Sequence, residues 1–87
     1  MVQALGARAG NGMVMSGRDR LKMRNFVRMH RARLDITQEE LAQRLGVSRQ
    51  TIHAIERGKA EPSVALALQI ARFFEMPVDE LFQLVEE

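Results

Sequence analysis

The stretch ITQEELAQRLGVSRQTIHAIERGK, residues 36–59, decides the fold of this chain. Thr37 and Glu40 have the spacing of a capping box, in which each side chain bonds the backbone N–H of the other residue, so a helix is expected to begin there. Gly46 can adopt the left-handed conformation that ends a helix, and Ser48 is a good N-cap for another one. The stretch therefore predicts two helices joined by a turn so short that they must cross steeply.

The second of these helices, expected over residues 49–57, has two chemically different faces. At about 100° per residue, Ile52 and Ile55 point to one side, toward a core. The opposite side carries long polar side chains, which are Arg49, Gln50, His53 and Arg57. Such a face suits the major groove of DNA, because Arg matches the edge of guanine and Gln the edge of adenine. Taken alone, the pattern is more typical of an ordinary amphipathic surface helix, so the flanking sequence has to decide.

Helical periodicity predicts three further helices. The first begins near Arg20 and places on one face Met23, Val27, His30 and Leu34. A helix over residues 64–74 is apolar nearly all round, so we expect it to be the central buried helix. A last, short helix repeats apolar residues at positions 78, 81, 82 and 85 and ends at residues 86–87. Because no alternating β-branched run occurs, we predict an all-α fold.

The chain divides into two parts. Residues 1–20 are interrupted by four glycines and have no sustained period, so we expect a flexible N-terminal arm. Residues 21–87 are expected to form the folded domain. Two interpretations of the arm remain open: it contacts phosphates through Arg8, Arg18 and Arg20, or it results from translation that begins upstream of Met13, Met15 or Met23.

Composition excludes several classes of protein. The 87 residues, with no cysteine and 46% hydrophobic residues, suit one small soluble domain that lacks disulfides and often dimerises. No apolar run approaches the ~20 residues needed to span a membrane and no secretory signal is recognisable, so we expect a cytoplasmic protein with no membrane partner. Residues 1–59 hold 12 Lys/Arg against 5 Asp/Glu, whereas residues 60–87 hold 1 against 6. The basic half indicates a polyanionic partner, unless these charges merely cluster on a solvated surface.

Residues 36–59 closely resemble the Cro/phage-repressor (XRE) family of helix-turn-helix transcriptional regulators. The TQEELA start, the LGVS turn, the RQTI segment and the ERGK ending occur in register, and the likeness covers about residues 22–82. The resemblance implies a five-helix bundle of the lambda-repressor-like DNA-binding type, whose members commonly bind palindromic operators in double-stranded DNA as homodimers. We therefore interpret the protein as a sequence-specific transcriptional regulator, and specifically as a repressor. The alternative is an antitoxin-like interaction module whose apolar C-terminal helix sequesters a partner protein.

The resemblance also implies roles for single residues. Base readers would be Arg49, Gln50 and His53. Contacts to phosphates or to the groove edge would come from Gln38, Ser48, Thr51, Arg57 and Lys59. A partly buried ion pair between Arg31 and Glu56 would tie the first helix to the recognition helix. Positions 53 and 57 depart from the common pattern, since many members of the family carry Asn there.

The remaining residues indicate a dimer and argue against other kinds of site. The apolar surplus near the C-terminus exceeds the need of one small core, and we expect it to form a homodimer interface containing Phe73, Phe82, Leu84 and Val85. His30 and His53 lack a partner at metal-ligand spacing, so no metal site is expected. No nucleophile motif, carboxylate pair or phosphate loop occurs, so we expect no enzymatic activity, cofactor or small-molecule ligand.

Overall fold

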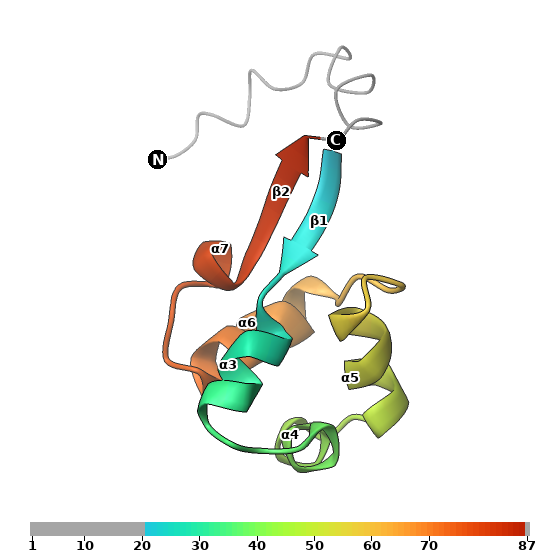
Figure 1. The fold of residues 1–87 in the computed structure, drawn as a ribbon, viewed down its shortest axis with the longest axis vertical. Coiled ribbons are helices and arrows are strands. Elements are labelled where there is room, and N and C mark those ends of the chain that lie inside the picture. The colour runs from blue at the N-terminus through green and yellow to red at the C-terminus, as the bar shows by residue number, and fades with distance from the viewer. Residues whose placement is uncertain (1–20, 87) are drawn as a thin grey trace.

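The computed structural model describes residues 21–86, and the arm expected over residues 1–20 lies outside this range. Five helices lie between two short strands (Figure 1). The elements in chain order are β1 (Leu21–Asn25), α3 (Val27–Arg33), α4 (Gln38–Leu45), α5 (Arg49–Glu56), α6 (Val64–Phe73), α7 (Val78–Leu81) and β2 (Phe82–Glu86). No helix in the described range is long and apolar enough to cross a membrane.

The sequence signals between residues 37 and 51 have their expected local effect. The Thr37 side chain accepts a hydrogen bond from the Glu40 N–H at 3.0 Å, while the Glu40 carboxylate accepts one from the Thr37 N–H at 2.8 Å. Gly46 ends α4 with a φ of 73°, in the left-handed region. The Ser48 hydroxyl then accepts from the Thr51 N–H at 3.1 Å and caps α5. The predicted pair of helices joined by a tight turn is confirmed.

The all-α prediction is wrong at both ends of the domain. Residues 21–25 and 82–86 form an antiparallel ribbon, with Met23 opposite Leu84, that projects beyond the helices (Figure 1). The first helix therefore begins only at Val27, and the last helix ends at Leu81. Each segment is too short for its hydrophobic pattern to distinguish the period of 2 of a strand from the period of 3.6 of a helix. The two strands also lie far apart in the sequence, so their pairing could not be recognised from it.

The base of the ribbon is attached to the helices by polar contacts. The Asn25 side chain donates to the Ile55 carbonyl oxygen at 2.8 Å and accepts from the Val27 N–H at 3.1 Å. The Phe26 N–H donates to the Leu81 carbonyl oxygen at 3.0 Å. These bonds connect β1 to the C-terminal end of α5 and to α7, and they set the position at which α3 begins.

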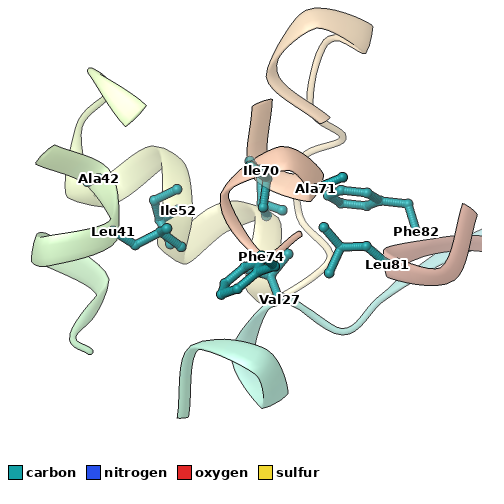
Figure 2. Close-up of a cluster of buried hydrophobic side chains, with 10 residues drawn as sticks. Val27, Leu41, Ala42, Ile52, Ile70, Ala71, Phe74, Leu81 and Phe82 are labelled. Atoms are coloured by element: carbon teal, nitrogen blue, oxygen red, sulfur yellow. The ribbon is translucent and has the colours of Figure 1, made fainter. Parts of the chain in front are cut away.

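The hydrophobic core is centred on the C-terminal half of α6. Figure 2 shows Ile70, Ala71 and Phe74 between two groups of side chains, one formed by Leu41 and Ile52 and the other by Leu81 and Phe82. The first half of α6 does not fit the prediction of a centrally buried helix, because Val64 and Leu68 are 77% and 52% exposed. The apolar residues of α6 therefore cover more of its circumference than the core of one chain can use.

Candidate nucleic-acid interface

The recognition helix α5 turns one face to the core and the other to solvent. Ile52 and Ile55 are buried, and Ile52 packs beside Leu41 of α4 (Figure 2). The exposed residues of its opposite face are Arg49, Gln50, His53 and Arg57, the last of which is the C-cap. All four polar side chains singled out from the sequence are thus presented together on one side of the domain.

Gln38, the first residue of α4, connects the two ends of α5. Its Nε2 donates to Glu56 Oε1 at 3.0 Å and lies 3.4 Å from His53 Nδ1. Its Oε1 accepts from Arg49 Nη1 at 3.4 Å. A carboxylate only accepts and a guanidinium only donates, so these two neighbours determine the orientation of the amide. The side chain expected to contact DNA is therefore already held by α5.

Arg31 and Glu56 form the ion pair that joins α3 to α5. Arg31 Nε lies 2.7 Å from Glu56 Oε2, and Nη2 donates to Oε1 at 3.1 Å. Nη1 of the same guanidinium donates to the Ile36 carbonyl oxygen at 2.9 Å. The Glu56 side chain is only 3% exposed and that of Arg31 16%. This bidentate geometry gives both oxygens of a nearly buried carboxylate a donor.

The pKa shifts of the pair follow from this geometry. Burial acts to raise the pKa of Glu56, but the hydrogen bonds from Arg31 and Gln38 and the charges of Arg31 and Arg28 outweigh it, and the pKa lies below its ordinary value. The hydrogen bond to Glu56 raises the pKa of Arg31, against a smaller opposing effect of burial. Both groups are therefore charged at neutral pH, and the pair is an ionic link between α3 and α5.

The other expected phosphate contacts lie at the two ends of α5. Ser48 Oγ and Thr51 Oγ1 are 3.0 Å apart at the start of the helix. At its end Gly58 has a φ of 74°, and the Lys59 N–H donates to the Ala54 carbonyl oxygen at 2.9 Å. The Lys59 side chain is exposed. The structure brings Gln38, Arg49, His53 and Arg57 around one hollow, whereas Ser48, Thr51 and Lys59 lie outside its lining.

Sequence reasoning gave no role to Arg28, although this residue also lines that hollow. Arg28 lies three residues before Arg31 on α3, and residues so spaced share a helix face. The sequence shows that Arg28 and Arg31 share a helix face. It does not show that this face points toward α5, because the periodicity predicts a helix that already begins near Arg20.

The four residues expected at a dimer interface do not form a single surface. Phe82 is 8% exposed and belongs to the core of its own chain, so it is not available to a partner in this conformation. Phe73 is half-buried and packs edge-on against Phe74, with ring centroids 5.2 Å apart. Leu84 is 63% exposed, and the half-buried Val85 lies on the opposite face of the same strand. Only Leu84 remains strongly exposed.

The two crossed helices α4 and α5, with an outward polar face on the second, define a helix-turn-helix DNA-binding protein. A family model described as helix-turn-helix matches residues 27–81, from the start of α3 to the end of α7. The chain belongs to the helix-turn-helix family in its Cro/phage-repressor (XRE) type, and so to the DNA-binding regulators of transcription.

Similar proteins occur in archaea and bacteria. An uncharacterized HTH-type transcriptional regulator of Methanocaldococcus jannaschii is 52% identical over 60 residues, which are 69% of this chain and 91% of that protein. The uncharacterized HTH-type transcriptional regulator YgzD of Bacillus subtilis is 46% identical over 65 residues, 75% of this chain and 98% of that protein. The cryptic phage CTXphi transcriptional repressor RstR of Vibrio cholerae is 34% identical over 55 residues, 63% of this chain and 50% of that protein.

Proposed function

We propose that this regulator is a repressor that binds a palindromic operator as a homodimer and blocks transcription by occupying the promoter. The observation that carries the proposal is the exposed polar face of α5, backed by buried Ile52 and Ile55. Arg49, Gln50 and His53 read base edges from this face, while Arg57, Lys59, Gln38 and the hydroxyls of Ser48 and Thr51 contact the backbone or the groove edge. Repression is also what the name of the similar phage protein RstR describes.

The ribbon supports a dimer different from the one expected. Side chains alternate along paired strands, so Leu21, Met23 and Leu84 share one face. Leu84 and Leu21 are 63% and 41% exposed on that face. Burying such leucines against a second copy removes apolar surface from water and stabilises a dimer. We assign the second copy to this face of the ribbon, with Leu84 at its centre.

Selection of bound DNA from a random pool tests the function. A dimer is expected to enrich two inverted half-sites whose centres lie about 34–36 Å apart, with affinity that falls steeply as salt rises. Gln50→Ala is expected to relax base preference at one position of each half-site. Failure to enrich any site, with binding that is weak and insensitive to salt, would contradict sequence-specific operator binding.

The dimer has its own test. Leu84→Ser is expected to shift the protein to monomer in sedimentation equilibrium, whereas Leu68→Ser, which also changes an exposed leucine but on α6, leaves the mass unchanged. A wild-type protein that sediments as a monomer at concentrations that saturate the operator contradicts the dimer. Repression itself is measured with a reporter whose promoter overlaps the selected site, and increased reporter expression on binding contradicts a repressor.

The antitoxin-like alternative receives no support from the fold. It relied on an apolar C-terminal helix that would sequester a partner protein. In the described chain, α7 has 4 residues and the next five form β2, so the segment that would act as this helix is a strand paired with β1.

A further inference from the structure

An open hollow of about 350 Å³ lies between α3 and α5 and is strongly basic. Its lining contains four guanidinium groups and one carboxylate, together with Gln38 and His53. The guanidinium groups are those of Arg28, Arg31, Arg49 and Arg57. Arg28 stands on α3, outside the helix-turn-helix pair.

The one carboxylate in the hollow forms an ion pair with only one of these four groups. Both oxygens of Glu56 accept from Arg31, and one also accepts from Gln38. Within residues 21–86, the side chains of Arg28 and Arg57 form no ion pair with an acidic side chain. Like charges gathered in one hollow repel each other, so an anion bound among them is stabilised.

A second hollow continues the basic surface onto the ribbon. It has a volume of about 340 Å³, shares Glu56 and Arg57 with the first, and is also lined by Arg24 of β1. Arg24 lies on the ribbon face opposite Leu84, because its neighbour Met23 pairs with Leu84 and side chains alternate along a strand. The ribbon thus carries the exposed Leu21 and Leu84 on one face and, on its other side, an arginine near the end of α5.

We propose that Arg28 and Arg24 bind phosphates of the operator backbone, so that the DNA contact extends from α5 over α3 and onto β1. The inference rests on the proposed function, because the basic surface begins at the DNA-facing residues Arg49 and His53 and continues past Arg57. An arginine fork fits phosphate oxygens with two hydrogen bonds. These two side chains lie beyond the base-reading face of α5, so they add affinity without reading sequence.

Salt titrations of single variants on the selected operator test the proposal. Each substitution removes one phosphate-binding side chain from both subunits of the dimer. The slope of log K against log salt is therefore expected to fall by about 1.8, and the affinity ratio between 50 and 200 mM salt to shrink by about 12-fold, in Arg28→Ala and in Arg24→Ala. Arg28→Lys retains the charge and is expected to keep the wild-type slope. Arg33→Ala is the matched control, because Arg33 is also exposed on α3 but lines neither hollow.

The outcomes separate this inference from the proposed function. Melting curves first establish that the variants are folded. If Arg28→Ala and Arg24→Ala keep the wild-type slope, as Arg33→Ala is expected to, the inference is wrong although operator binding stands. If either variant changes base preference in the selection assay, its role is not that of a backbone contact and the inference is again wrong. Absence of salt-dependent binding by the wild-type protein contradicts the proposed function itself.

Discussion

The helix-turn-helix pair and the β ribbon are stabilised by interactions of different range. α4 and α5 begin and end through contacts between residues a few positions apart, such as Thr37 with Glu40. The ribbon exists because Leu21–Asn25 pairs with Phe82–Glu86 across the whole length of the domain. A helix cap can be recognised in a short stretch of sequence, whereas the pairing of two distant five-residue strands cannot. We therefore expect α4 and α5 to keep their structure when the pairing of the ribbon is disrupted.

The largest effect is expected from the ion pair that joins these helices to α3. Arg31→Ala leaves the Glu56 carboxylate, 3% exposed, without its charged partner. Removing one member of a buried pair costs about 3–5 kcal/mol, so the free energy of unfolding in urea should fall by that amount. Arg33→Ala, an exposed change on the same helix, is expected to alter it by less than about 0.5 kcal/mol. Equal midpoints and slopes of the urea unfolding curves of Arg31→Ala and Arg33→Ala would show that the ion pair contributes nothing to stability.

The same pair predicts a loss of stability in acid. The pKa of Glu56 is lower in the folded protein than its ordinary value, so its contribution is complete above the unfolded pKa of about 4.3 and is lost as pH falls through the lower folded pKa. Glu56→Gln retains the shape of the side chain but does not titrate. The difference in unfolding free energy between wild type and Glu56→Gln is therefore expected to be constant from pH 7 to 5 and to shrink below about pH 4.3. A difference that does not depend on pH would refute the linkage.

The ranges of these interactions explain what the sequence could predict. The capping box, Gly46, Ser48 and the two faces of α5 depend on neighbouring residues, and the structure has them as expected. The ribbon was missed because Met23 and Val27, four residues apart, also suit a helix. The exposed start of α6 could not be predicted, because hydrophobic residues indicate that a helix can be buried but not which of its faces packs against the core.

The features of the candidate site also differ in whether they depend on one helix or on the packing of several. The exposed arc of Arg49, Gln50 and His53 follows from helical geometry alone. The engagement of Gln38 by Glu56 and the place of Arg28 beside α5 depend on how α3, α4 and α5 are packed together. Only the resemblance to a known family anticipated any contact of this kind, namely that of Arg31 with Glu56.

A smaller effect is expected from substitution of Gly46, the residue whose left-handed backbone conformation ends α4. A Cβ at this position meets nothing within 4 Å, so the cost of Gly46→Ala comes only from the left-handed backbone, with φ at 73°. That cost is about 1–2 kcal/mol and should appear as a lower unfolding free energy. Gly46→Asn is the matched variant, because Asn tolerates this conformation and should lose less. A larger loss for Asn than for Ala would mean that backbone conformation is not what selects glycine here.

The smallest global effect is expected from breaking the ribbon. Phe82 already has φ −125° and ψ 125°, the extended conformation that a following proline requires, so Gln83→Pro disturbs strand pairing without displacing the core side chain. Isolated two-stranded ribbons are only marginally stable, so at protein concentrations low enough for the chain to be monomeric the free energy of unfolding should fall by about 1 kcal/mol or less. Amide hydrogen exchange should accelerate in residues 22–24 and 84–86 and stay unchanged in α4 and α5, with Gln83→Ala as the control. Accelerated exchange in α4 and α5 would instead show that ribbon and helices unfold as one unit, and that the local contacts of the helix-turn-helix pair are insufficient without the distant strands.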